Sequence, residues 1–372
     1  MFSTITVSRC LRSLGKYEVA VEVLEKLYLL VVSELGEDND LTIDLIVELG
    51  SKYYWLGQYH TALNLLEKAL EKRQNKNQNI WNVKWHLANT YDALGKYQQA
   101  IEIRKEIAEK QEKVCGENGL NTINAMNKLV LSYYKVGQYN EAVKLGQKVL
   151  KKYTELLGEN HPLTLNAMSN LSLLYSRIGQ YQKSLNLGQI ALERRIEILG
   201  EDHPLTLYPL NNMAICYDYL GQNELALELR EKVLEKRIKI FGEKNPETLT
   251  AMSNLAETHN KMGNYDVALS LTRKAIDTFE KQLGKEHECT ADTMNNLSGA
   301  LSGLGRHDEA IKVQKEACEI SERLLGEQNP RTIERLEALA TRLKAAGKTD
   351  EAAEVEARLK TLSEQSQEQA QV

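Results

Sequence analysis

The chain has 372 residues, a formal net charge of −5 and 27% charged residues, with only five prolines and three phenylalanines. This length exceeds that of a single hydrophobic core, so several domains or a repeat array are expected. The composition favours helices over a β-sandwich or barrel, and the modest net charge without a long basic stripe argues against nucleic acid as a partner.

The amino-terminal segment, Met1 to Tyr17, has no acidic residue and loosely resembles a mitochondrial presequence. The alternative is the first helix of a repeat, because Val7 and Leu11 precede Gly15 by the same eight and four residues as apolar side chains in later units. We favour this second interpretation. The unit lacks its linker, so either the natural chain starts there or an upstream segment has been removed.

Two sets of glycines divide the chain into units. Turn glycines recur every 42 residues, with one interval of 38, at Gly15, Gly57, Gly95, Gly137, Gly179, Gly221, Gly263, Gly305 and Gly347. Linker glycines lie 21 residues before most of them, at Gly36, Gly116, Gly158, Gly200, Gly242, Gly284 and Gly326. Two breaks per period predict two helices per unit: helix A before the turn glycine and helix B after it. Each helix B is expected to end in a left-handed linker glycine.

The linkers predict how each helix A begins. Four of them carry proline, which suits the first helical position, and Asn245, Asn329, His161 and His203 precede these prolines as expected N-terminal caps. A threonine follows six residues after every linker glycine, and we interpret its hydroxyl as a local structural bond. These threonines are Thr42, Thr122, Thr164, Thr206, Thr248, Thr290 and Thr332.

Side chains at fixed distances from the turn glycine predict how helices A and B pack. The residue eight positions before it is apolar: Leu49, Leu87, Leu129, Leu171, Met213, Leu255, Leu297 and Leu339. The residue five positions after it is small: Ala20, Ala62, Ala100, Ala142, Ser184, Ala226, Ala268, Ala310 and Ala352. A small side chain at this position indicates that the two helices cross closely there.

Three departures from the period carry expectations of their own. In the 38-residue interval the polar stretch from Gln74 to Asn79 replaces the Gly–Pro linker, so a change in superhelical phase is expected there. Pro209 is expected to kink helix A of its unit. The repeat array is expected to cover residues 1–360, and the polar, Gln-rich residues 361–372 to form a disordered tail.

The spacing of Leu, Tyr, Gly and Ala resembles that of the tetratricopeptide repeat. Its 42-residue form, with Leu157-Gly-Glu-Asn-His-Pro162 between units and Leu171 and Tyr175 within helix A, is similar to the kinesin light chain repeat. Nephrocystin-type and bacterial signalling proteins carry similar arrays. The resemblance implies an all-α, right-handed superhelical solenoid of about nine helix–turn–helix repeats, whose helices A line a concave groove that binds peptides or partner domains.

One helix A position predicts how that groove binds. Nine residues before the turn glycine, four successive units carry Asn170, Asn212, Asn254 and Asn296. Asparagine offers both a donor and an acceptor, so this ladder can clamp an extended peptide backbone. The resemblance implies the same, because a similar asparagine of kinesin light chains contacts cargo peptide. The alternative is that the ladder braces neighbouring repeats through hydrogen bonds between helices.

Further inward-facing side chains bear on the choice of ligand. Basic and amide residues near the ladder favour an acidic peptide. They are Lys128, Lys135, Arg177, Asn127 and Asn166. Inward-facing acids such as Asp218 and Glu257 make the electrostatic field of the groove patchy. Trp55 and Trp85 form either an exposed aromatic binding spot or a filling for the space left by the shortened repeat.

Motifs of catalysis are missing from the sequence. It contains no G-x-x-x-x-G-K-[ST] loop, G-x-S-x-G elbow or H-E-x-x-H helix, and His287 and Cys289 stand in a linker, so no enzyme activity, cofactor or metal is expected. Five scattered cysteines without a C-x-x-C pair predict a cytoplasmic location. The longest apolar run, Leu27 to Val32, is too short to enter a membrane as a spanning helix.

These observations favour a non-catalytic scaffold that binds a protein or an extended, acidic peptide in its concave groove. The alternative is a sensor or oligomerisation array from a larger signalling protein, which would self-associate. The two differ in whether the molecular mass in solution rises with concentration.

Overall fold

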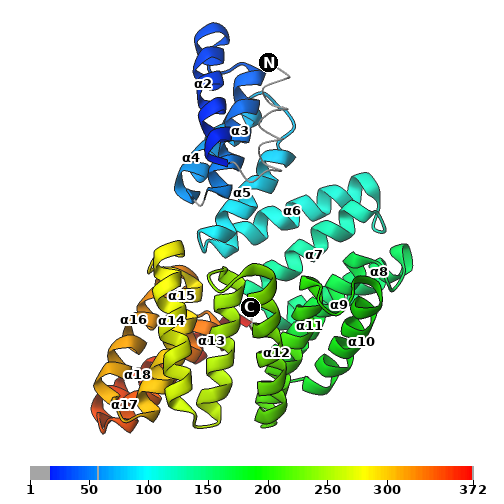
Figure 1. Cartoon of the computed structure of the whole chain (residues 1–372). Coiled ribbons are helices and arrows are strands. Elements are labelled where there is room, and N and C mark those ends of the chain that lie inside the picture. The colour runs from blue at the N-terminus through cyan, green and yellow to red at the C-terminus, as the bar shows by residue number, and fades with distance from the viewer. Residues whose placement is uncertain (1–16, 57, 371–372) are drawn as a thin grey trace. The chain divides into compact units, whose positions relative to one another are not determined.

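The computed structural model describes residues 17–56 and 58–370, which form helices joined by short turns (Figure 1). The helices A are α3 (Asp40–Trp55), α5 (Trp81–Ala93), α7 (Leu120–Lys135), α9 (Pro162–Arg177), α11 (Leu207–Tyr219), α13 (Pro246–Lys261), α15 (Glu288–Gly303) and α17 (Pro330–Ala345). The helices B are α2 (Tyr17–Leu35), α4 (Tyr59–Asn75), α6 (Tyr97–Cys115), α8 (Tyr139–Leu157), α10 (Tyr181–Leu199), α12 (Asn223–Phe241), α14 (Tyr265–Leu283), α16 (His307–Leu325) and α18 (Thr349–Ala370). The alternation confirms the two-helix unit and the all-α class. The expected first helix A, with Gly15, and the turn residue Gly57 lie outside the described residues.

The array is divided into two compact units, Met1–Ser132 (unit 1) and Tyr133–Val372 (unit 2). The sequence predicted a single array with a phase change at residues 74–79, whereas this division falls inside α7. At residues 74–79 the missing linker glycine is replaced by Asn77, whose φ of 53° is the positive value that asparagine tolerates better than most residues. The polar linker therefore still closes α4, without the glycine used elsewhere.

The linkers confirm the predicted caps. Gly200, with φ 85° and ψ 161°, illustrates why glycine ends helix B, because side chains beyond hydrogen exclude that conformation. Asn245 and Asn329 accept hydrogen bonds from backbone N–H groups two residues later, at 2.9 and 3.0 Å. The Nδ1 atoms of His161 and His203 do the same at 3.2 Å. Four linker threonines donate to the carbonyl of the linker glycine six residues earlier: Thr42, Thr122, Thr164 and Thr290.

The cap of α15 predicts that the stability of unit 2 depends on pH. His287 Nδ1 accepts from the N–H of Cys289 at 3.2 Å, and only the neutral ring can accept there. Burial lowers the pKa of His287 below its usual 6.5, although Glu288 and Asp292 oppose this shift. A lowered folded-state pKa means that this contribution is complete above pH 6.5 and is lost as the pH falls below it.

Between about pH 7 and pH 5 we expect the free energy of unfolding of wild type to fall by about 1 kcal/mol more than that of His287→Asn. Asparagine caps α13 and α17 in the same linker position and does not titrate. Urea unfolding at both pH values measures the difference. Equal losses for the two proteins would show that protonation of His287 does not break the cap.

The close crossing of helices A and B is confirmed by burial. All nine small residues five positions after the turn glycines are completely buried. Ser184 shows how a polar residue is accommodated at this position, because its hydroxyl donates to the carbonyl of Ser172 at 2.6 Å. The apolar residues eight positions before the glycines pack against the same crossing, and Leu87, Leu171 and Leu339 are no more than 5% exposed.

Two expectations were wrong. Pro209 does not kink an established helix: the unit begins with a 3₁₀ turn, Pro204–Thr206, and α11 starts only at Leu207. Pro209 therefore lies in the first turn of α11, where a backbone N–H has no acceptor to lose. The expected disordered tail from residue 361 is instead a continuation of α18 to Ala370, and Leu362 is buried in the carboxy-terminal hydrophobic cluster.

Unit 2 closes on itself through a contact between residues far apart in sequence. The side-chain amide of Asn329, just before α17, donates to the carbonyl of Lys135 at 2.9 Å, 194 positions away. A Cβ added to Gly137 would lie 2.2 Å from two ring atoms of Pro330. We call Lys135, Gly137, Asn329 and Pro330 the closing contact. It brings the turn after α7 against the start of α17.

Candidate functional site

A cavity of about 840 Å³ lies in unit 2, walled by helices A from α9 to α17 and by Tyr134 at the end of α7. Side chains about one turn apart on a helix share a face, so each helix A contributes several to the wall. The described lining contains six asparagines, seven cationic side chains and five anionic ones. The cavity is therefore polar and carries a surplus of two positive charges.

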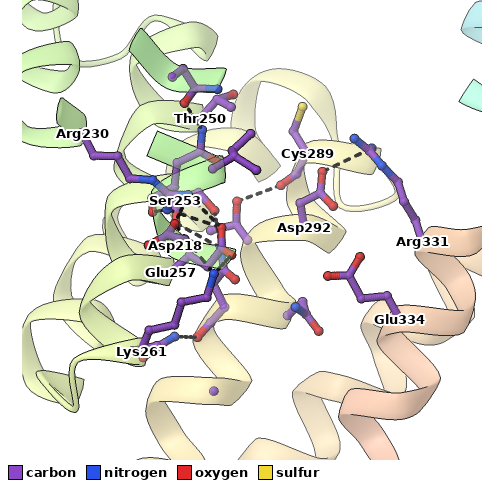
Figure 2. A pocket seen from close by; sticks show the side chains of 18 of the residues that line it. Asp218, Arg230, Thr250, Ser253, Glu257, Lys261, Cys289, Asp292, Arg331 and Glu334 are labelled. Carbon is purple, nitrogen blue, oxygen red and sulfur yellow. Dashed lines mark hydrogen bonds and ion pairs between the residues drawn. The ribbon is translucent and has the colours of Figure 1, made fainter. Parts of the chain in front are cut away.

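The first group of charges, the Asp218 cluster, consists of Asp218, Arg230, Glu257 and Lys261 (Figure 2). Arg230 lies 2.5 Å from Asp218 and 3.4 Å from Glu257, and Lys261 lies 2.8 Å from Glu257. The Asp218 and Arg230 side chains are 1% and 2% exposed. Burial raises the pKa of Asp218 although Arg230 and Lys261 oppose it. Burial also opposes ionisation of Glu257, but Arg230 and Lys261 outweigh it and lower the pKa of Glu257 to about 2.

The second group, the Asp292 cluster, consists of Asp292, Arg331 and Arg335. Arg335 pairs with Asp292 and donates to the hydroxyl of Ser321, while Arg331 lies 3.6 Å from Asp292. Burial opposes ionisation of Asp292, yet Arg331 and Arg335 lower its pKa. The neighbouring Tyr134 is affected in the same way, because Arg177 and Arg331 overcome the effect of burial and lower the pKa of its hydroxyl.

Three charged side chains of the lining have no oppositely charged partner among the described residues. Arg177 donates only to the hydroxyl of Tyr134, at 3.5 Å. Glu334 stands apart from both clusters in Figure 2, and burial raises its pKa although Arg177 opposes the shift. Arg342 lines the cavity with no hydrogen bond or ion pair to the described part of the chain, and its Nε is buried. These side chains are two cations and one carboxylate that the described part of the fold leaves uncompensated.

The predicted asparagine ladder is present, and its amide nitrogens point back toward the preceding repeat. The Nδ2 of Asn212 donates to the carbonyl of Ser169 at 2.9 Å, and that of Asn296 to the carbonyl of Ser253 at 3.0 Å. The Nδ2 of Asn254 donates to Oδ1 of Asn211 at 2.9 Å. The donors of three ladder residues thus brace neighbouring helices A, which is the alternative that the sequence left open.

Several asparagine amides of the cavity wall have a second polar atom that forms no hydrogen bond to the described protein. Among the described residues no donor reaches Oδ1 of Asn254 or Asn296, and no acceptor is reached by Nδ2 of Asn211 or Asn295. All four residues line the cavity. Bracing and ligand binding are therefore compatible, because each amide has two polar atoms and bracing uses one.

The structure gathers some of the predicted site residues and separates others. Four line the unit 2 cavity: Arg177, Asn212, Asn254 and Asn296. Asn170 lies on α9 outside that lining, Asn166 accepts from Arg195 at 2.8 Å, and Lys135 takes part in the closing contact.

The remaining candidates belong to unit 1. Trp85 and Lys128 line a second cavity of about 330 Å³, together with Arg104 and Asn124. Asn127 lies on α7 outside that lining. Trp55 is 52% exposed and Trp85 is 47% exposed, so neither indole is a core side chain of the shortened repeat.

Several lining residues were missed from the sequence, among them Arg342, Glu334 and Asp292. For Glu334 and Asp292, but not for Arg342, a signal was present, because residues 13, 9 or 10, 6 and 2 positions before the turn glycine share one helix face. Thirteen positions before it stand Tyr208, Thr250, Asp292 and Glu334, all of which line the cavity. Only the position nine residues before the glycine was read as a ladder. Arg230, from helix B, had no such signal.

The described residues show neither a metal-binding cluster nor a membrane-spanning helix. They contain no group of three or more His, Cys, Asp or Glu side chains placed to hold a metal ion. None of their helices combines the length and apolar character that a membrane span requires.

Comparison with known proteins gives a family match. The model of the tetratricopeptide repeat matches residues 3–75, 79–153, 124–189, 177–239, 219–281, 247–323 and 300–365. No characterised protein sequence matches the chain significantly.

Solved structures support the fold alone. A Rap protein complexed with competence and sporulation factor is 17% identical, covers 99% of this chain and 98% of its own, and has a TM-score of 0.70. The apo quorum sensor NprR from B. thuringiensis is 17% identical over 86% of each chain, with a TM-score of 0.63. The nearly identical repeats of a putative kinesin light chain from Podosopora anserina are 25% identical, cover 54% of this chain and 95% of theirs, and have a TM-score of 0.43.

Proposed function

The chain belongs to the tetratricopeptide repeat family, and we propose that unit 2 is a non-catalytic module that holds an extended peptide segment in its cavity. The observation that carries this proposal is the pair Asn254 and Asn211, in which only one of the two polar atoms of each amide forms a hydrogen bond between them. Asn254 and Asn211 bind each other through one polar atom each, which leaves one acceptor and one donor on adjacent helices A. An extended peptide residue offers one N–H and one C=O, so such a pair can bind its backbone without regard to its side chain.

The charges of the cavity favour an acidic segment. Five of the seven cations are paired with four carboxylates of the same lining, whereas Arg177 and Arg342 have no carboxylate partner among the described residues. Charged groups that are removed from water without a partner are costly, and an acidic ligand would supply the missing charge. The Rap neighbour, solved with competence and sporulation factor, gives a precedent for a ligand on this fold.

The test uses Asn254→Ala combined with Asn296→Ala in the full chain. An array of immobilised hexapeptides is probed with labelled protein, and we expect the double variant to bind wild-type hits at least about tenfold more weakly, because two or more backbone hydrogen bonds are lost. Asn186→Ala is the matched control, because Asn186 lies on the exposed side of α10 and bonds only to Gln182.

Unchanged binding by a folded double variant would contradict the proposal and leave the ladder with its bracing role alone. The alternative function, an oligomerisation array, would instead appear as a molecular mass that rises with concentration in light scattering while no array peptide binds.

A further inference from the structure

Arg342 is a charged side chain of unit 2 for which the fold itself offers no partner. It comes from α17, the last helix A of the array, and lines the cavity. Among the described residues it forms no hydrogen bond and no ion pair, and its Nε is buried without an acceptor. Burial lowers the pKa of Arg342, with Tyr265 acting in the opposite direction; no protein carboxylate contributes.

This environment contrasts with that of the neighbouring arginine on the same helix. Arg335, about two turns earlier, pairs with Asp292 and also donates to the Ser321 hydroxyl. A buried cation without a partner destabilises a fold, whereas a paired one is largely compensated. An unpaired Arg342 does not stabilise unit 2, so its place in the cavity needs another explanation.

The surroundings of Arg342 form a small polar recess. Its Nη2 lies 3.2 Å from the position that a Cβ would take on Gly299, and the Asn260 side chain lies 3.0 Å from the same point. Any side chain at residue 299 would therefore displace both groups. The Nδ2 of Asn260 donates to the carbonyl of Asn296 at 2.8 Å, while its Oδ1 is buried without a donor. The recess thus presents a guanidinium and an amide oxygen that the fold leaves unbonded.

We propose that Arg342 and Asn260 form a subsite for a carboxylate of the bound peptide. This inference rests on the peptide-binding function proposed above and adds the chemical group that fixes the ligand in the cavity. A guanidinium binds a carboxylate through two parallel N–H donors, and Oδ1 of Asn260 can accept from a peptide N–H beside that carboxylate. The carboxylate comes from the peptide's own carboxyl terminus or from an Asp or Glu side chain.

The experiment compares the wild-type chain with Arg342→Gln on two hexapeptide libraries, one with free carboxyl termini and one with carboxyl-terminal amides. We expect Arg342→Gln to bind the selected free-acid peptides at least about tenfold more weakly, as expected for a lost charge-assisted pair. Lys344→Gln is the matched control on the same helix, because Lys344 is 56% exposed and pairs with Glu356 of α18. Its binding should remain within about twofold of wild type.

Each library outcome has a defined meaning. If amidated peptides no longer bind, the group recognised is the carboxyl terminus. If amidated peptides still bind, but only those that contain Asp or Glu, the group recognised is a side-chain carboxylate. If Arg342→Gln binds like wild type while Asn254→Ala with Asn296→Ala does not, the carboxylate subsite is wrong and the proposed function stands. If wild type binds no peptide, both are overturned.

A second measurement needs no ligand. In the free protein Arg342→Met should leave the Tm unchanged or raise it by about 2–4 °C, because it removes an uncompensated charge. Arg335→Met should lower the Tm, because it leaves Asp292 without its closest partner. A decrease of the Tm for Arg342→Met as large as that for Arg335→Met would show that Arg342 is structural, and would overturn the subsite.

Discussion

Arg230→Met is expected to lower the free energy of unfolding by about 3–5 kcal/mol. Arg230 is 2% exposed, lies 2.5 Å from the equally buried Asp218, and also donates to the backbone carbonyl of Asn254. Methionine fills much of the same volume, so the loss would come from the buried carboxylate of Asp218, which would keep only Lys261, at 3.7 Å, as a cationic neighbour. Urea unfolding at neutral pH measures it.

The expected pH dependence identifies the cause. The pKa of Asp218 is already raised by burial, and removal of Arg230 takes away the main opposing interaction, so it should rise further. A raised folded-state pKa means that protonation favours the folded state as the pH falls. The destabilisation by Arg230→Met should therefore be smaller in acid than at neutral pH, and a penalty independent of pH would contradict this explanation.

An exposed ion pair provides the control. Lys274 and Glu243 lie 2.8 Å apart with side chains that are 52% and 55% exposed. Lys274→Met should cost less than about 1 kcal/mol, because water screens the pair and solvates the remaining carboxylate. Similar losses for Lys274→Met and Arg230→Met would show that burial does not distinguish the two pairs.

Gly137→Ala is expected to lower the free energy of unfolding by about 2–4 kcal/mol, whereas Gly263→Ala is expected to lower it by about 1 kcal/mol. The two glycines occupy the same turn of different repeats, with φ of 78° and 80°, so the backbone strain is matched. They differ in their neighbours: a Cβ at Gly137 would lie 2.2 Å from Pro330, whereas nothing lies within 4 Å of one at Gly263. The difference between the variants isolates the closing contact.

Thermal and urea unfolding of both variants, under the same conditions, measure this difference. Equal destabilisation would show that Gly137 and Pro330 do not stay together in solution. In that case the wall that α17 contributes to the cavity would not be fixed by the closing contact.

Much of the local structure could be predicted because it depends on neighbours in sequence. Asn245 and Asn329 cap their helices through backbone groups two residues away, and glycine is required at the linkers by φ alone. The Pro209 prediction failed for a local reason as well, because proline inside the expected helix A delays the start of α11 instead of bending it.

The site could be predicted only in part. The asparagine ladder repeats at one position, so periodicity places Asn212, Asn254 and Asn296 on the cavity wall. Periodicity does not indicate which polar atom of each amide is used within the protein, because that depends on the distance between adjacent helices A. Arg230 was missed because it comes from helix B. Arg342 was missed because its surroundings, Gly299 and Asn260, belong to the two preceding repeats.

The sequence by itself determined the repeat, the two helices of each unit, their caps and the small residues at their crossings, since all of these follow from contacts within one period. Only the tertiary structure decided where the array divides, that Lys135 meets Asn329 across 194 positions, and which cavity charges remain uncompensated. The physical reason is that small rotations between successive repeats accumulate along a solenoid. Their sum, which no single period specifies, brings the ends of unit 2 together and leaves Arg342 facing a cavity without a carboxylate of its own.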